Sequence, residues 1–301
     1  MTFFCRIILT SCSLLLLLQS VAVASGEIAW QELEPGLDLA RVSVVFAPSG
    51  LSAEAVPGEA TEPPLPQSFQ TASTTLLRID PEKFVFSLYM ASERGPKTFG
   101  EVGAGEGFVA AVNAGMFHRD RVTSTGYLRS GTHINNGHVA ANFGAFFVAN
   151  PKEAGIPQAR VLDRSVNDWK TALERYDLVM QNYRMTAPGG RVIWKQASRI
   201  HSVAALSQDA KGRIFFIFCS KPVPAAEYMA ALLRLPLNLE TVMYLEGGFE
   251  AALFLNAGGV NVVEAGRHSS GLWGGSAGLL LPNVLGVRRR VDTVSGVKTT
   301  P

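Results

Sequence analysis

Short apolar stretches of strand length, separated by turn-forming residues, recur along most of this chain and limit what it can fold into. They occupy residues 42–46, 74–79, 84–90, 108–112, 145–148, 177–180, 203–206, 213–219, 241–245 and 251–255. Runs of this length that are rich in Val, Ile, Phe and Tyr predict β-strands. We expect 74–79 and 84–90 to form a hairpin, because the turn sequence Asp80-Pro81 lies between them.

Helical patterns are few. Residues 167–176 predict a short helix capped by Ser165 or Asn167, and a second helix is expected to open at Pro224, where Tyr228 is followed by apolar residues at helical spacing. Many strands and few helices, without strict alternation, predict an α+β fold. We expect a single domain with a mixed, mostly antiparallel β-sheet flanked by a few helices.

The first 24 residues have the order of a secretion signal. Arg6 precedes an apolar stretch that begins at Ile7, and the small residues Ala22-Val23-Ala24 follow it. The stretch is about a dozen residues long, whereas a spanning helix needs about 20, so a signal peptide is favoured over an anchor. We expect cleavage after Ala24, a periplasmic or secreted location and no integral membrane segment in the mature chain.

The remainder divides by composition into three parts. Residues 25–75 predict an N-terminal strand and a loop rich in Pro and Gly, 76–287 the main domain, and 288–301 a basic tail. After signal cleavage Cys219 is the only cysteine, so no disulfide can form within the mature chain. Its place beside an apolar run predicts a buried core thiol rather than a nucleophile.

Several functional classes are disfavoured. The formal net charge of +2 and the single basic cluster at 288–290 do not provide the broad basic face of a nucleic-acid-binding protein. The usual serine-hydrolase, zinc-protease and phosphate-loop motifs are absent from the sequence. The five histidines have no metal-ligand spacing, so we expect neither a metal nor a cofactor.

Three local patterns carry candidate chemistry. In the first, the apolar strand at 108–112 stops at Asn113 and is followed closely by Gly115, which allows backbone to approach a ligand. A turn held by the Asn113 side chain is an equally good interpretation. In the second, Glu246 ends a strand before Gly247 and Gly248. Such a carboxylate either faces a cleft as an acid, base or nucleophile, or caps the next turn.

The third pattern combines Arg199 and His201, which lead into the strand at 203–206, with Gln181 at the end of the strand at 177–180. An arginine fork is suited to a phosphate because it donates two parallel hydrogen bonds. A surface arginine is the commoner outcome for such a residue.

Together and in this order, the patterns resemble the phosphodiester glycosidase family. The family's N-A-G-M-F segment is matched letter for letter at 113–117, and its G-N-F segment is approximated at 141–143. Its Q-S-G-P segment keeps only the glutamine at 181–184, and its R-x-A-I-G segment keeps the arginine at 199–204 with different spacing. Its L-D-G-G segment has Glu in place of Asp at 245–248.

The resemblance spans residues 76–287 and implies cleavage of the bond between the anomeric carbon of a sugar and a phosphate. The substrate would be a carbohydrate or sugar phosphodiester, with Glu246 stabilising the sugar cation or acting as base or nucleophile. Arg199, helped by His201, would hold the phosphate. The implied catalytic residues are Glu246, Arg199 and Asn113, and the implied substrate-binding residues are His201, Gln181, Asn142, Gly115, Gly247 and Gly248.

Other interpretations stay open. The longer Glu246 side chain moves the carboxylate by about one methylene, which favours family membership over activity. A non-catalytic envelope or exopolysaccharide-binding protein on the same fold is the alternative, and an unrelated structural envelope protein is a third class. Glu250, Asp120 and Asp163 are possible second carboxylates, and none stands out in the sequence.

Overall fold

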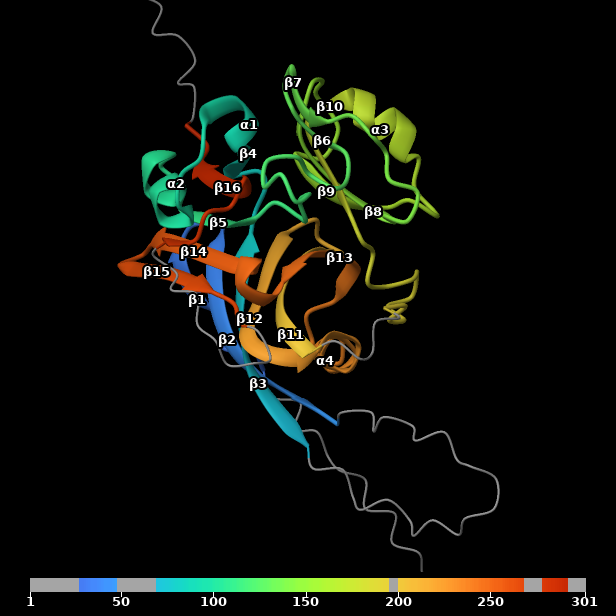
Figure 1. Ribbon diagram of the computed structural model, residues 1–301. Helices are drawn as coiled ribbons and strands as arrows, with labels where there is room; N and C mark the ends of the chain where they lie inside the picture. The colour runs from blue at the N-terminus through green and yellow to red at the C-terminus, as the bar shows by residue number, and fades with distance from the viewer. Residues whose placement is uncertain (1–26, 48–68, 195–199, 268–277, 292–301) are drawn as a thin grey trace, which may run out of the picture.

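The computed structural model describes residues 27–47, 69–194, 200–267 and 278–291, and these residues build three β-sheets around a shared core (Figure 1). The predicted signal peptide, most of the Pro- and Gly-rich loop, and Arg199 lie outside the described residues. No helix in the described part of the chain is long and apolar enough to cross a membrane.

The largest sheet has six strands and ends at the strand that carries Glu246. In spatial order these are β1 (Gln31–Glu34), β2 (Leu37–Phe46), β3 (Gln70–Ile79), β12 (Ile214–Pro224), β11 (Ile200–Asp209) and β13 (Leu239–Gly247). Helix α4 (Ala225–Leu232) begins after Pro224, as the sequence predicts, and buries Tyr228 and Met229 against this sheet.

The second sheet contains the strand that ends beside Gln181. Its strands are β7 (His133–Asn136), β6 (Leu128–Ser130), β10 (Tyr176–Asn182), β8 (Ala145–Pro151) and β9 (Ala159–Asp163). Helix α3 (Trp169–Arg175) packs on it, with the Trp169 ring stacked on Phe146 at 5.2 Å between centroids. Its cap is Asp168, whose side chain accepts the Thr171 amide, so the predicted caps were wrong.

The third sheet contains the strand that ends at Asn113. Its strands are β15 (Val260–Ala265), β14 (Ala252–Ala257), β5 (Ala110–Asn113), β16 (Asn283–Arg289) and β4 (Phe84–Met90). The short helices α1 (Ala91–Arg94) and α2 (Phe99–Gly105) lie beside it (Figure 1). The 3₁₀ turn η1 (Gly248–Glu250) connects β13 of the first sheet to β14 of this one.

One aromatic residue shows how the sheets share a core. Phe86 on β4 makes edge-to-face contacts with Phe147 on β8, at 5.1 Å, and with Phe216 on β12, at 6.4 Å. Each ring comes from a different sheet, and all three side chains are buried. Because the apolar surface of each sheet is removed from water only by the other two, the three sheets form one packing unit.

The sheet arrangement corrects the predicted pairing. Strands 74–79 and 84–90 do flank a turn, but β3 pairs with β2 and β12 whereas β4 pairs with β16, so the predicted hairpin was wrong. All pairings between described strands are antiparallel. The mostly antiparallel prediction is therefore confirmed, while the mixed single sheet is replaced by three antiparallel sheets.

The basic cluster 288–290, expected to begin a solvated tail, lies at the end of β16 and directly after it. Arg288 and Arg289 are the last residues of β16, where they form ion pairs with Glu106 and Glu34. Arg290 donates to the backbone carbonyls of Pro81 and Glu82. These arginines hold the end of the third sheet to its neighbours instead of lying free in solvent.

Cys219 on β12 is buried, as the sequence predicts, and is the only cysteine among the described residues. Burial raises the pKa of its thiol to about 11. A thiol that stays protonated at neutral pH is a poor nucleophile.

Replacing Gly286 by Ala is expected to destabilise the protein. Gly286 lies on β16 between β4 and β5, and a Cβ there would overlap the ring of Phe108. Overpacking of this kind costs about 1–3 kcal/mol, which urea unfolding measures. The matched control is Gly105→Ala at the end of α2, where a Cβ meets nothing within 4 Å. Equal stability of the two variants would contradict the packing described for β16.

Candidate functional site

Glu246 lies one residue before the end of β13, opposite Ala204 on β11. The chain then turns at Gly248, which has a φ of +65° that glycine adopts without strain, and enters η1. The amide of Gly247 donates to the Glu246 side chain at 3.0 Å. The second glycine of the motif thus reverses the strand, while the first gives Glu246 a backbone partner.

The Glu246 carboxyl is half-buried and holds its proton more tightly than an ordinary glutamate. Burial raises its pKa from 4.5 to about 7; the hydrogen bond from Gly247 opposes this shift and the negative charge of Glu250 adds to it. The side chain therefore changes charge close to neutral pH. A carboxyl of this kind is suited to acid–base or electrostatic catalysis if a ligand reaches it.

Asn113 ends β5 with a buried side chain whose amide nitrogen is unused. Its Oδ1 accepts the amide of Ala252 at 3.2 Å, which joins the end of β5 to the residues that follow η1. Its Nδ2 is buried without a hydrogen-bond partner among the described residues. Because buried amide hydrogens are normally satisfied, this donor is available to a bound group or water. Oδ1 thus fixes the backbone, as the second interpretation from the sequence expects, and a role of Nδ2 in binding stays a prediction.

Asn182 connects the Asn113 loop to the Glu246 strand. Gly115 has a φ of +83°, and a Cβ at that position would lie 2.9 Å from Asn182 Nδ2. The same Nδ2 donates to the carbonyl of Leu245 at 2.9 Å. The three segments that end β5, β10 and β13 therefore meet here, and only glycine leaves room for the approach. Asn182 is a site residue that sequence reasoning missed, although it follows Gln181 directly.

A β-bulge places Glu246 and Tyr244 on opposite faces of β13. Ala204 pairs with Glu246 and Ala205 pairs with Tyr244, so Leu245 is the extra residue. Ala204 belongs to the core shared by the three sheets, whereas Ala205 and Tyr244 pack with α4 on the other face. Since opposed residues share a face, Glu246 is directed toward the side of the third sheet, where Asn113 lies.

His201 lies on the opposite face from Glu246. A Cβ at Gly247 would overlap both the His201 ring and the Tyr244 hydroxyl, so these groups close over the glycine. His201 Nδ1 lies 2.8 Å from the carbonyl of Ser202, and its ring centroid lies 6.0 Å from that of Tyr244. The structure therefore brings His201 to the residue after Glu246, across the strand from the carboxylate.

Gln181 has a different role from the predicted one. Its Oε1 accepts the amides of Tyr127 and Ala140, and its Nε2 donates to the carbonyls of Ala140 and Phe143. These bonds use every hydrogen-bonding position of the side chain, which is 1% exposed. The prediction that Gln181 binds substrate was wrong, because its amide instead fixes the turn at 140–143.

A row of aromatic rings leads from that turn to Gly247. The ring centroid of Tyr183 lies 4.4 Å from that of Phe143 and 5.6 Å from that of Trp194, and the Trp194 centroid lies 4.7 Å from that of Tyr244.

Asn142, a predicted binding residue, is exposed and donates to the Tyr183 hydroxyl at 3.1 Å. Trp194 Nε1 is buried without a partner among the described residues. Nothing local in the sequence marks Tyr183 and Trp194 as neighbours, since they meet only where the chain after β10 folds back on itself and packs against β13.

Two arginines lie near the start of β11. The predicted one, Arg199, immediately precedes β11 in the sequence and lies outside the described residues. A second arginine, Arg267, is held nearby: its amide donates to Ser202 Oγ at 2.6 Å, and Ser202 Oγ donates to the carbonyl of Ser220 at 2.6 Å. Sequence reasoning did not identify Arg267, which is close to β11 only because β15 returns there.

Of the three possible second carboxylates, only Glu250 is close enough to influence Glu246. It lies in η1, and its charge contributes to the raised pKa of Glu246. Asp163 is instead an ion-pair partner of Arg184, and Asp120 accepts the amides of Val122 and Thr123. Among the described residues no group of three or more His, Cys, Asp or Glu side chains is placed to hold a metal ion.

The chain matches the profile described as phosphodiester glycosidase over residues 106–288. This range contains Asn113, Asn182 and Glu246, the residues that meet at the ends of β5, β10 and β13. No curated protein matches the chain in sequence.

Two solved structures share the fold at a TM-score of 0.55. One is a hypothetical protein from Synechocystis, with 13% sequence identity. The match covers 88% of this chain and 64% of that protein's chain. The other is the catalytic domain of zebrafish N-acetylglucosamine-1-phosphodiester α-N-acetylglucosaminidase, auto-inhibited by its pro-peptide. It is 12% identical, with 88% of this chain and 87% of that domain covered. At these identities the likeness concerns the fold.

The titration of Glu246 is expected to make stability depend on pH. Between its ordinary pKa of 4.5 and the raised value of about 7, the folded state binds more protons at this side chain than the unfolded state. Stability from this group is therefore lost as pH rises through that window. Relative to the unsubstituted protein, Glu246→Gln should gain up to about 3 kcal/mol between pH 4.5 and 8, measured by urea unfolding.

The matched control is Glu32→Gln on the exposed part of β1. A pH slope in Glu246→Gln equal to that of the unsubstituted protein would show that Glu246 does not titrate in this window.

Proposed function

We propose, from the premise that this chain belongs to the phosphodiester glycosidase family, that it is an exported hydrolase that cleaves the bond between a sugar and a phosphodiester. The observation that carries the proposal is the meeting of three features at one place. Glu246 titrates near neutral pH, Asn113 offers an unused buried donor, and Asn182 donates to the Leu245 carbonyl and lies close against Gly115.

The proposed reaction breaks the bond between the anomeric carbon and the phosphate oxygen. Water adds its oxygen to the sugar and its protons go to products and solvent, so a free sugar and a phosphomonoester are formed. Because the phosphate is already a fair leaving group, the sugar cation in the transition state is the centre that most needs stabilisation. The ionised Glu246 carboxylate supplies it, as an electrostatic stabiliser, a base or a nucleophile.

Glutamate in place of the family's aspartate fits the local backbone. The Leu245 bulge and the turn at Gly248 determine where along β13 the Glu246 side chain leaves the sheet. Its carboxylate bends back and accepts the backbone amide of Gly247. The extra methylene thus folds toward its own backbone instead of extending fully into the site. This arrangement supports the enzyme interpretation over a binding protein that has lost its carboxylate.

The phosphate would be held by arginine. Arg199 directly precedes β11, and Arg267 is bonded through its backbone to Ser202 of the same strand. Arg199 is two residues before His201 in the sequence, and Arg267 is bonded to Ser202, the residue after His201. His201 in turn packs over Gly247.

The aromatic row would form the apolar wall of the binding site. Sugar rings present C–H faces that pack on aromatic rings and hydroxyl edges that need hydrogen-bond partners. Trp194 is the central ring of the row, with an indole N–H that is free to donate. We assign it to the sugar or to the group on the far side of the phosphate.

Export is part of the proposal and rests on residues 1–24, whose charged, apolar and small-residue segments follow the order of a signal peptide. A periplasmic or secreted location would give the enzyme access to extracellular or cell-wall polysaccharide.

Glu246→Gln is expected to lower kcat/KM for sugar-1-phosphodiesters by about 10²- to 10⁴-fold. Because the ionised carboxylate is the active form, kcat/KM of the unsubstituted protein should rise with pH through about 7. Release of free sugar from a panel of glucose-, mannose- and N-acetylglucosamine-1-phosphodiesters measures both effects.

The control is Glu32→Gln, which should hydrolyse the same diesters at the unsubstituted rate. Arg199→Ala, assayed in parallel, tests the phosphate side. Silence of the folded parent protein on the whole panel would reject hydrolysis and favour a carbohydrate-binding protein.

Trp194→Ala should raise KM by about fivefold with a smaller change in kcat, because stacking of this kind contributes about 1 kcal/mol to binding. Trp194→Phe, which keeps an aromatic face, should recover most of the loss. Steady-state kinetics on the best diester of the panel give the two constants. The matched control is Trp169→Phe on α3, whose ring stacks on Phe146 in another part of the second sheet. An unchanged KM in Trp194→Ala would remove the aromatic row from the substrate site.

A further inference from the structure

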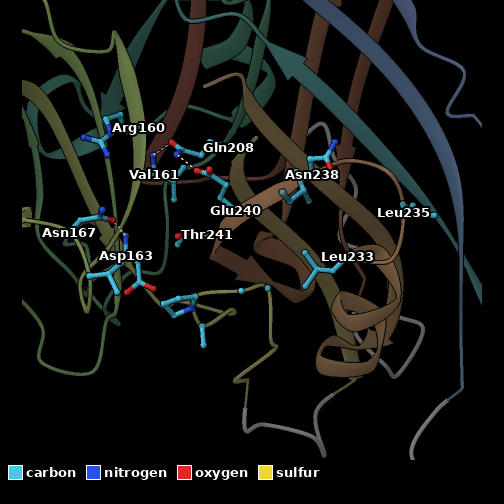
Figure 2. Close-up of a pocket in the computed structure, with 16 residues that line it drawn as sticks. Arg160, Val161, Asp163, Asn167, Gln208, Leu233, Leu235, Asn238, Glu240 and Thr241 are labelled. Atoms are coloured by element: carbon cyan, nitrogen blue, oxygen red, sulfur yellow. Dashed lines mark hydrogen bonds between the residues drawn. The ribbon is translucent and has the colours of Figure 1, made fainter. Parts of the chain in front are cut away.

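A cavity lies at the opposite end of β13 from Glu246. It has a volume of about 570 Å³, within the range of small-molecule sites. Figure 2 shows its walls: β9 and the loop at 166–167 on one side, the loop after α4 on the other, and the start of β13 between them. Ala187 to Gly190 complete the lining.

The cavity lies beside a β-bulge in the pairing of β11 with β13. Ser207 pairs with Val242 and Asp209 pairs with Leu239, so Gln208 faces two residues, Glu240 and Thr241, across a bulge. The Gln208 side chain donates to the Glu240 carboxylate at 2.6 Å and accepts the backbone amide of Val161 at 2.8 Å (Figure 2). This bridge ties β9 to both strands and fixes the polar wall.

Several polar groups on the walls have no protein partner. The Asn238 amide, the Thr241 hydroxyl and Asn167 Nδ2 make no hydrogen bond to any described residue. Asn238 is held with a φ of +52°, an uncommon conformation for a residue other than glycine. Donors and acceptors are thus presented on both sides of one cavity.

The charges of the cavity do not favour an ionic ligand. Asp163 forms an ion pair with Arg184, and one oxygen of Glu240 accepts the Gln208 amide. Arg160 brings a positive charge to the rim that offsets the remaining negative charge. A neutral ligand with many hydroxyl groups fits this balance of amides, hydroxyls and paired charges.

The remaining wall is apolar. Leu233, Leu235 and Leu239 are half-buried, pack against the core around α4 and line the cavity. A ligand with one apolar face and hydroxyl edges would contact the leucines and the amides at the same time. Pyranose rings have this construction.

We propose that this cavity binds a neutral segment of a carbohydrate chain; the choice of carbohydrate rests on the proposed function. Thr241 and Glu246 are five residues apart on β13, which corresponds to about 17 Å of strand. The segment from Asn182 to Gly190 runs from the Glu246 end to the cavity wall beside the same strand. A polysaccharide held in the cavity is therefore tethered near the reactive carboxylate, which raises its local concentration.

The test uses the full mature protein with ¹³C-labelled leucine methyl groups. Maltohexaose, cellohexaose, mannohexaose and hexa-N-acetylchitohexaose are titrated, and methyl spectra are recorded. At least one should shift the methyl signals of Leu233, Leu235 and Leu239 while leaving Leu253, on β14, in place. Absence of these shifts with all four probes would overturn the proposal.

Two substitutions place the ligand in the cavity. Asn238→Ala and Thr241→Val should each weaken binding by about fivefold, the effect of one lost hydrogen bond. Asn256→Ala, on the exposed part of β14, is the matched control and should bind as the unsubstituted protein does. Equal affinity in all three variants would contradict the assignment, whatever the overall affinity.

The outcome is separable from that of the hydrolysis experiment. Glu246→Gln should lose hydrolysis of small sugar-1-phosphodiesters and keep the leucine shifts, whereas Asn238→Ala should keep that hydrolysis. Shifts without any hydrolysis by the parent protein would reject the enzyme and retain the carbohydrate cavity. Loss of the shifts in Glu246→Gln would reject a separate cavity site.

Discussion

The antiparallel contact between residues 182–186 and β13 is the interaction on which the rest of the site depends. The Tyr244 amide donates to the Tyr183 carbonyl at 2.9 Å, and the Met185 amide donates to the Val242 carbonyl at 2.8 Å. These bonds cover the outer edge of the six-stranded sheet, which an unpaired strand would otherwise expose. They also attach the second sheet to the first, so the Gly115–Asn182 approach, the aromatic row and the cavity at 187–190 share one origin.

The placement of Glu246 illustrates how burial and access are balanced. Further into the sheet, its carboxyl would lie in the core shared by the three sheets and stay protonated at all physiological pH values. Further out, water would return its pKa to the ordinary range. The Leu245 bulge and the Gly248 turn hold it between these limits, where burial raises the pKa to about 7.

Local patterns predicted the strands well, since a run of β-branched and aromatic residues can be recognised from the short stretch of sequence that contains it. Pairing depended on contacts far along the chain: β3 and β4 are separated by the short turn at 80–83 but join different sheets. The same limit applies to the site. Asn113 and Glu246 could be found because their segments carry a recognisable order. The structural role of Gln181 and the assembly of Tyr183 with Trp194 depend on partners from other elements.

The unreactive thiol of Cys219 has a practical consequence. Because Cys219 is buried and its pKa is about 11, it reacts poorly with a thiol reagent at neutral pH. The described part of the chain contains no other cysteine. A single cysteine introduced at an exposed position, such as Ile200 at the start of β11, would then be the main site for a fluorophore or spin label among the described residues. Such a label would report on the part of the chain beside the candidate site.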